Sequence, residues 1–197
     1  LKPLKTHAGK QNGMPTEKPK ALLLLSGGFD SPVAGILAQR KGFNVAAIHF
    51  SNELFAGKES IEKSKRLAQM KCFEPFYACD LSNELATLSK EAYHKHYFVL
   101  MKRLMLRVAE KVAQREHHDT LITGENLGQV SSQTLSNLTL ITRAIQMPIL
   151  RPLLLHDKLE ILNLAEQFGT YETSKGPEHF DALGPAHPIT KGKPEDI

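Results

Sequence analysis

A run of apolar residues that ends in a double-glycine turn constrains this chain more than any other feature. Residues 22–31 read Leu-Leu-Leu-Leu-Ser-Gly-Gly-Phe-Asp-Ser. The four leucines are typical of a buried strand. After Pro32, apolar residues recur at helical spacing, and proline is favoured in the first turn of a helix. The sequence therefore predicts a strand, a glycine turn and a helix whose first amides point at the turn, which is an arrangement that binds phosphate.

The residues of this turn distinguish it from other phosphate-binding loops. No lysine follows the glycines as in a Walker A loop, and the adjacent Gly27 and Gly28 do not fit the GxGxxG of dinucleotide-binding folds. The glycines permit positive φ and close backbone approach, while Ser26 and Ser31 offer hydroxyl donors. Asp30 would repel a phosphate unless a cation stands between them, which indicates Mg²⁺ bridged through a pyrophosphate. The alternative is an ordinary strand-to-helix turn with a capping Asp or Ser.

Length, charge and cysteine content narrow the class of protein. The 197 residues suit one α/β domain with a full core. No apolar run reaches the ~18–20 residues of a membrane span, and the polar, basic N-terminus predicts no secretory signal, so we expect a cytoplasmic protein without a membrane partner. A net charge of +4 is compatible with an RNA partner, although a solvated basic surface is commoner. The two cysteines, Cys72 and Cys79, are too few for a disulfide framework or a structural zinc site.

Apolar runs alternate with helical patterns from residue 21 onward. The expected strands cover residues 21–25, 44–50, 73–79, 120–123 and 149–153, and the expected helices cover residues 33–40, 58–70, 83–117, 127–145 and 156–168. This alternation predicts an α/β fold, namely a doubly wound, mostly parallel sheet with helices on both faces. We expect a linker or flexible arm over residues 1–20, the domain over residues 21–175 and an irregular C-terminal tail over residues 176–197.

A second polar motif follows the strand expected at residues 120–123. Residues 124–135 read Gly-Glu-Asn-Leu-Gly-Gln-Val-Ser-Ser-Gln-Thr-Leu. Small and amide side chains let a backbone approach a ligand and offer paired donors and acceptors, although a capped polar loop explains them equally well. In parallel sheets ligands bind beyond the carboxyl ends of the strands. Because the turn at residues 26–31, His49-Phe50 and Gly124-Glu125 all fall at such ends, we expect one shared site.

The two motifs together resemble those of the ThiI family of tRNA 4-thiouridine synthetases (tRNA sulfurtransferases), which contain a PP-loop ATP-pyrophosphatase domain. The motifs are Ser-Gly-Gly-Phe-Asp-Ser-Pro-Val-Ala-Gly at residues 26–35 and the string at residues 124–135. The similarity extends in order through residues 47–50, 101–105, 149–153 and 168–172, and it covers the chain from residue 21 to about residue 191.

This resemblance implies an enzyme that cleaves ATP between the α and β phosphates and adenylylates O4 of a tRNA uridine. Sulfur from a cysteine desulfurase persulfide then displaces AMP, and in some bacteria the family also supplies sulfur for the thiamine thiazole. ATP and Mg²⁺ are the implied cofactors and tRNA is the implied partner. The runner-up interpretations are PP-loop adenylylation of a small molecule and a non-catalytic nucleotide-binding subunit. The oligomeric state stays open, with a homodimer among the alternatives.

The resemblance also implies site roles. Leu24 and Leu25 would line the adenine site through backbone atoms, and His49 and Phe50 would flank the nucleotide. The pyrophosphate and Mg²⁺ would be held by Ser26, Gly27, Gly28, Asp30 and Ser31. Lys102 and Arg103 would face the phosphates or the RNA, and Gly124 and Gln133 would complete the pocket. Asp30 and Arg103 are the implied catalytic residues. Two alternatives remain: Arg103 on a solvated helix face, and His49 as a hydrogen-bonded histidine at the edge of the core.

Two departures from the family pattern concern RNA binding and sulfur transfer. Family members usually carry an N-terminal ferredoxin-like and THUMP region that grips tRNA, whereas about twenty residues precede the domain here, so we expect a separate THUMP-type RNA-binding region or chain. The family's sulfur-handling cysteine is also missing from residues 176–183, where Asp181 occupies or adjoins its place. Since a carboxylate cannot form a persulfide, we expect a partner to supply the sulfur, with Cys72 and Cys79 as less favoured relays.

Overall fold

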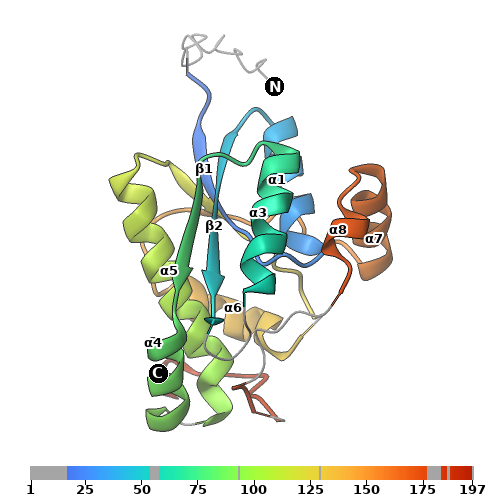
Figure 1. The fold of residues 1–197 in the computed structure, drawn as a ribbon. Coiled ribbons are helices and arrows are strands. Elements are labelled where there is room, and N and C mark those ends of the chain that lie inside the picture. Colours follow the sequence, from blue (N-terminus) through green and yellow to red (C-terminus); the bar gives the residue numbers. More distant parts are fainter. Residues whose placement is uncertain are drawn as a thin grey trace, which may run out of the picture.

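The fold is built on five parallel strands. The computed structural model describes residues 17–53, 58–92, 94–128, 130–176, 183–185 and 187–196. The strands are β1 (Lys20–Leu24), β2 (Asn44–Ser51), β3 (Phe76–Asp80), β4 (Thr120–Ile122) and β5 (Ile149–Leu150). They form a single sheet in the order β3-β2-β1-β4-β5, and every neighbouring pair is parallel. The predicted parallel α/β architecture is therefore confirmed (Figure 1).

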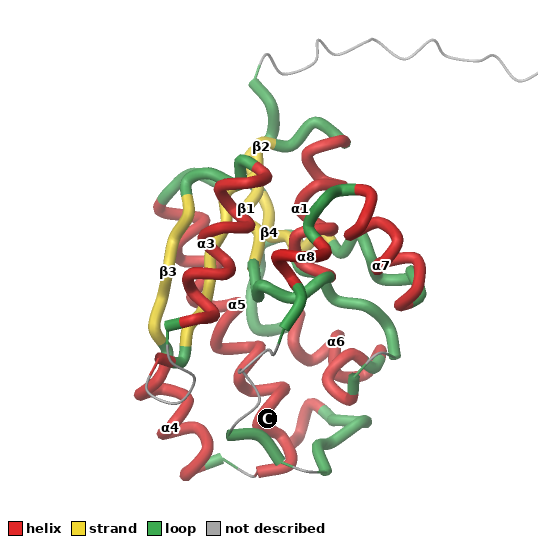
Figure 2. The backbone as a smooth tube through the Cα atoms, turned by 45° about the vertical axis from the view of Figure 1, so that its right-hand side comes forward, coloured by secondary structure: helices red, strands yellow, loops and turns green. Residues whose placement is uncertain are grey.

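Helices cover both faces of the sheet (Figure 2). They are α1 (Asp30–Arg40), α3 (Glu59–Lys71), α4 (Ser82–Glu91), α5 (Tyr97–Arg115), α6 (Leu135–Thr142), α7 (Lys158–Gln167) and α8 (Tyr171–Ser174). Short 3-10 helices span His94–His96, Ser131–Gln133 and Pro194–Asp196. Alternate side chains of β1 enter opposite cores: Leu23 packs with residues of α1, α3 and α7, and Leu22 packs with residues of α4, α5 and α6. Burial on both faces explains the uninterrupted leucine run.

Two expected helices differ from those observed. The pattern at residues 83–117 is divided between α4 and α5, because Ala92 adopts an extended conformation and the chain restarts so that Tyr97 is fully buried. Residues 127–145 become α-helical only at Leu135, since Gly128 has a φ of 82° and Val130 is extended. Thr134 then caps α6 by accepting a hydrogen bond from a backbone amide in the first turn.

The strand order reverses between β1 and β4. From β1 the chain moves outward to β2 and β3, and it then returns to the other side of β1 to form β4 and β5. At such a reversal the loops after the two central strands diverge to opposite faces and leave a crevice at the carboxyl ends. The glycine turn after β1 and the polar motif after β4 border this crevice, so the topology brings the two sequence motifs together.

The C-terminal segment is irregular but attached to α6. Residues 183–185 and 187–196 contain no strand and no helix beyond one 3-10 turn. Asn137 donates to the carbonyl of Ile189 and accepts from the amide of Gly192. Most of the expected linker and the position of Asp181 lie outside the described residues. Among the helices described, none is both long enough and apolar enough to cross a bilayer.

Candidate nucleotide-binding site

A cavity of about 440 Å³ opens at the carboxyl ends of β1 and β4. Ten of the predicted site residues line it: Leu24, Leu25, Ser26, Gly28, Asp30, Ser31, Phe50, Lys102, Gly124 and Gln133. Three others, Gly27, His49 and Arg103, do not. The cavity is of nucleotide size and combines a polar loop with an apolar wall, which is typical of ligand sites in parallel sheets.

The loop after β1 is closed by its own serine side chains. The Ser31 hydroxyl accepts from the amide of Ser26 at 3.0 Å, and the Ser26 hydroxyl accepts from the amide of Gly28 at 3.3 Å. Gly27 adopts a φ of 86°, which favours glycine. Within the described residues, the amides of Gly27 and Phe29 donate to no other protein group. The loop therefore presents unused N–H groups at one edge of the cavity.

The first turn of α1 adds a positive electrostatic end to this loop. Phe29 is the N-cap residue and makes no side-chain capping bond, so the alternative of a turn capped by Asp or Ser does not describe this helix. Eleven residues of helix follow, and their dipole favours an anion at the N-terminus. Open amides and an uncapped helix end together form a cradle for an oxyanion such as a phosphate.

Gly124 allows the loop after β4 to pack closely against the start of α1. A Cβ at Gly124 would lie 2.7 Å from the amide nitrogen of Ser31 and 2.8 Å from the carbonyl carbon of Asp30. Both atoms belong to the backbone, so neither can turn aside as a flexible side chain would. Glycine is therefore required for the two loops to meet, and the contact fixes the start of the loop after β4 relative to the phosphate cradle.

His49 lies behind the loop rather than in the cavity. Its ring is buried, with Nδ1 2.8 Å from the carbonyl oxygen of Leu25 and Nε2 3.4 Å from the hydroxyl of Ser60. Burial lowers the pKa of His49, although the hydrogen bond to Leu25 works in the opposite direction. A neutral ring that donates from Nδ1 fits this environment. Of the predicted pair, Phe50 alone lines the cavity, and the geometry matches the alternative of a hydrogen-bonded core-edge histidine.

Lys102 points into the crevice and is held there by a buried carboxylate. Its ammonium lies 3.2 Å from Glu125, whose other oxygen is 2.8 Å from the guanidinium of Arg151 and also accepts from the Thr123 hydroxyl. Burial by itself would raise the pKa of Glu125, but Lys102 and Arg151 outweigh it and hold the pKa below its usual value. The carboxylate is therefore charged, and both Glu125 and Lys102 line the cavity.

Arg103 points away from the crevice. Its guanidinium donates to the carbonyl of Leu140 on α6, and the side chain lines a groove between α4 and α5 together with Arg107. Burial, and then the charge of Arg107, lower the pKa of Arg103. Consecutive residues of a helix diverge by about 100°, so Lys102 and Arg103 cannot share one target. The structure does not bring Arg103 to the predicted site, and a contact with ATP phosphates has no support in this geometry.

Several cavity residues were missed by the sequence reasoning. One wall is apolar and comes mainly from α5 and α6: Phe98, Met101, Met105, Leu106 and Ile141. Lys158 contributes a second cation from the first turn of α7, next to a capping box formed by Asp157 and Glu160. The available signal was the polar Asp157-Lys158 pair that follows the last expected strand, because it too falls at a carboxyl end.

The loop after β4 is braced by amide side chains. The carbonyl oxygen of the Gln133 side chain accepts from the amide of Asn126 at 3.1 Å. Asn126 is buried and donates to the carbonyls of Leu153 and His156, which lie between β5 and α7. These bonds tie the loop to the segment that leads to Lys158, so the two walls of the crevice are connected.

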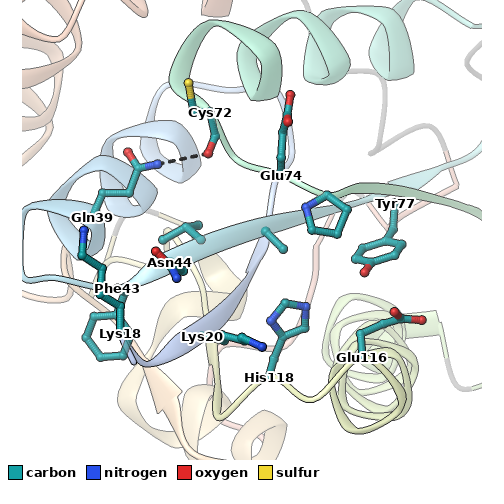
Figure 3. Close-up of a pocket in the computed structure, with 13 residues that line it drawn as sticks. Lys18, Lys20, Gln39, Phe43, Asn44, Cys72, Glu74, Tyr77, Glu116 and His118 are labelled. Carbon is teal, nitrogen blue, oxygen red and sulfur yellow. Dashed lines mark hydrogen bonds between the residues drawn. The ribbon is translucent and has the colours of Figure 1, made fainter. Parts of the chain in front are cut away.

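A second hollow of about 620 Å³ lies at the opposite end of the sheet, where the parallel strands begin (Figure 3). We call this end the amino edge. The lining of the hollow carries balanced charges, from two lysines and the glutamates Glu74 and Glu116. Gln39 reaches across to the backbone carbonyl of Cys72, as the dashed line in Figure 3 shows. No residue predicted to bind the nucleotide lines this hollow, so it is not the candidate site.

Neither cysteine lies at the crevice. Cys72 lines the hollow at the amino edge, and Cys79 lies in the edge strand β3. Burial, with smaller contributions from Glu84 and Asp80, raises the pKa of the Cys79 thiol. A raised pKa keeps the sulfur protonated and weakly nucleophilic at neutral pH. The less favoured interpretation of these cysteines as sulfur relays receives no support from their placement.

The fold and the cradle define a PP-loop domain. A 4-thiouridine synthetase solved in complex with RNA and bound ATP superposes with a TM-score of 0.84 and 34% identity, over 90% of this chain and 48% of that one. NMN synthetase from Francisella tularensis shares the fold, with a TM-score of 0.63 and 17% identity over 87% of this chain and 70% of that one.

Sequence comparison then gives the family. Residues 16–197 match the family model described as Thiamine biosynthesis protein (ThiI), and the chain belongs to that family. A probable tRNA sulfurtransferase of Lysinibacillus sphaericus is 43% identical over 192 residues, which is 94% of this chain and 48% of that protein. The corresponding protein of Finegoldia magna is 38% identical over 184 residues, covering 90% and 47%. The chain thus spans about half the length of the curated relatives it matches.

Proposed function

We propose that the crevice binds ATP and that the chain is the adenylylating domain of a tRNA sulfurtransferase. It would transfer AMP to O4 of a tRNA uridine and release pyrophosphate, as the activating step of 4-thiouridine synthesis. The observation that carries this proposal is the loop at residues 26–31, which borders a nucleotide-sized cavity and leaves the amides of Gly27 and Phe29 unused. The resemblance to a synthetase solved with both RNA and ATP supports it.

The lining of the cavity suits the two ends of ATP. The phosphates would lie on the loop amides and the first turn of α1, with Lys102 and Lys158 as nearby cations. The flat, apolar adenine would pack against the wall formed by α5 and α6, including Met101 and Ile141. Gly124 and Gln133 would close the side of the pocket that faces β4.

Asp30 fits the role of a Mg²⁺ ligand. It begins α1 and lines the cavity beside the cradle, and magnesium is usually held in proteins by one or two carboxylates together with substrate phosphates. When bound, the ion would neutralise the negative charge of the pyrophosphate. Asp30 would keep the ion and the phosphates in register, and it would repel a phosphate bound without the ion.

The protein's own groups would stabilise the displacement at phosphorus. The uridine O4 attacks the α-phosphorus while N3 releases its proton to water, and the bond to the bridging oxygen breaks, so that this oxygen leaves on pyrophosphate with the electron pair. The Phe29 amide and the α1 dipole would face the oxygens where charge accumulates, and the Gly27 amide is a further unused donor in the same loop. We further propose that a THUMP-type region, in the same polypeptide or another, binds the tRNA and that a cysteine desulfurase supplies the sulfur.

Pyrophosphate release tests this proposal. With ATP and tRNA present, we expect Asp30→Asn to lower the rate of release by at least about 100-fold while leaving the unfolding temperature nearly unchanged. Asp119→Asn is the matched control, because Asp119 accepts from the Lys20 amide at the amino edge of the sheet, away from the crevice. AMP formation without tRNA would favour the small-molecule alternative. ATP binding without any turnover, even with tRNA and a sulfur donor, would favour a non-catalytic subunit.

A further inference from the structure

The buried carboxylate of Glu125 is the centre of a charged network at the crevice. Its side chain is 9% exposed, and it meets two cations from different elements: Lys102 of α5 at 3.2 Å and Arg151, directly after β5, at 2.8 Å. Arg151 also donates to the hydroxyl of Thr142 on α6. Three segments far apart in the sequence therefore meet on one carboxylate.

Within the part of the chain that the structure describes, the network itself holds one more positive charge than negative charge. Two cations share a single carboxylate, and a lysine ammonium has three N–H donors, of which one is used by Glu125. The Lys102 side chain is 21% exposed and lines the cavity, whereas Arg151 does not line it. The excess charge is therefore presented to the crevice through Lys102.

The position of Glu125 also relates Lys102 to the phosphate cradle. Glu125 directly follows Gly124, whose backbone lies against Asp30 and Ser31 at the start of α1. A free lysine samples many rotamers, and fixing it in one of them costs conformational entropy. A carboxylate that holds the ammonium before the ligand arrives removes much of that cost from binding.

We propose that Glu125 is a positioning residue that holds the Lys102 ammonium toward the phosphates of ATP. The inference rests on the proposed function, because it takes ATP as the ligand of the crevice. A purely structural role, in which Glu125 only joins the ends of β4 and β5 through Arg151, would affect stability without affecting Lys102. The two roles make different predictions for a double variant.

ATP titration of four variants tests the positioning role. We expect Glu125→Gln and Lys102→Met each to raise the Kd for ATP about tenfold, and the double variant to bind ATP no more weakly than Lys102→Met alone. Glu125→Asp keeps the charge but shortens the reach, and we expect a smaller rise in Kd with an unfolding temperature close to that of the unmodified chain. This second substitution provides the test if Glu125→Gln does not fold.

A matched control separates positioning from a general loss of a bracing carboxylate. Glu110 of α5 accepts from the amides of Gln146 and Met147, which precede β5, and it does not line the crevice. Glu110→Gln should lower the unfolding temperature without changing the Kd for ATP. Unchanged or tighter ATP binding by Glu125→Gln, or additive losses in the double variant, would overturn the inference. Failure of the unmodified chain to bind ATP would instead overturn the proposed function on which the inference rests.

Discussion

The loops after β1 and β4 border the same crevice but are built in different ways. The loop at residues 26–31 is held by short contacts among its own serines and keeps backbone amides available. The loop at residues 123–133 is held by contacts with distant segments, through Glu125 to Arg151 and through Asn126 to the carbonyl of Leu153. The first loop is a self-contained cradle, and the second is a brace between strands and helices.

We therefore expect the first loop to determine ligand affinity and the second loop to stabilise the fold as well. Changes in the cradle should alter ligand affinity while leaving the free energy of unfolding almost intact, because few other parts depend on it. Changes in the brace should alter both quantities, since the brace also fixes the walls of the crevice. Three predictions test this division and a fourth compares the crevice with the amino edge, in order of the size of the expected effect.

The largest effect is expected where the two loops touch. In Gly124→Ala, the added methyl group would lie within 3 Å of backbone atoms of Asp30 and Ser31, so the start of α1 must move. We expect a loss of about 3 kcal/mol in the free energy of unfolding and at least about a 100-fold rise in the Kd for ATP. Urea unfolding and calorimetric titration measure the two quantities.

Gly128→Ala is the control for this substitution. Gly128 lies in the same loop, has a φ of 82°, and has open space where its Cβ would be. It should cost about 1 kcal/mol through backbone strain alone and leave ATP binding nearly unchanged. Equal effects of the two substitutions on the Kd would show that contact between the loops does not shape the site.

The next effect is expected at Asn126, the second anchor of the brace. Asn126→Ala would remove the side-chain donor from the carbonyls of Leu153 and His156, of which, among the described residues, only that of Leu153 keeps another donor, the His156 amide, and should cost about 2 kcal/mol of stability. The Kd for ATP should also rise, because these carbonyls precede α7 and Lys158. The exposed Asn163 of α7 provides the control, since Asn163→Ala should change stability by no more than about 0.5 kcal/mol. Undiminished stability in Asn126→Ala would mean that the loop is held by other contacts.

The cradle could be predicted from sequence because all of its signals are local. An apolar run, a glycine pair and a proline follow one another within residues 22–32, and each fixes the backbone of its own neighbourhood. The observed β1 and α1 differ from the expected ranges by one residue at the strand and three residues at the helix start. The alternation of strands and helices likewise gave the parallel sheet.

The brace could not be predicted in the same way, because its contacts cross long distances in the chain. Glu125 meets a lysine 23 residues earlier and an arginine 26 residues later. Whether Lys102 or Arg103 faces the crevice depends on how α5 rotates against the sheet, which is a property of packing rather than of the motif. The break at Ala92 was hidden for a related reason, since helical spacing persists on both sides of it.

A smaller effect is expected within the cradle. Ser31→Ala removes the acceptor of the Ser26 amide and should raise the Kd for ATP about three- to tenfold, with a change of less than about 1 kcal/mol in stability. Ser26→Ala removes a longer bond from the Gly28 amide and should have the weaker effect of the two. A large loss of stability in Ser31→Ala would show that the cradle also supports the fold, and the proposed division would fail.

The smallest effect concerns the protonation of two histidines, the buried His49 near the crevice and the half-buried His118 at the amino edge. Burial lowers the pKa of His49 behind the cradle, and burial also lowers the pKa of His118 beside the amino-edge hollow, where the nearby Glu116 opposes the shift. In the unfolded chain each of these imidazoles therefore binds a proton near pH 6.5, whereas in the folded chain it does so only at a lower pH. Stability is fully present above about pH 6.5 and decreases as the pH falls toward the folded-state pKa, by at most about 1.4 kcal/mol per pH unit for each such group.

Urea unfolding at about pH 7 and pH 5.5 measures this slope. His49→Gln and His118→Gln should each flatten the pH dependence of the free energy of unfolding, and the double variant should flatten it most. ATP affinity should respond to His49→Gln alone, because that ring holds the carbonyl of Leu25 at the entry to the cradle, whereas His118 lies at the opposite end of the sheet. An identical slope in the unmodified chain and the double variant would mean that neither imidazole is kept neutral by the fold, and a response of ATP affinity to His118→Gln would mean that the two edges of the sheet are coupled.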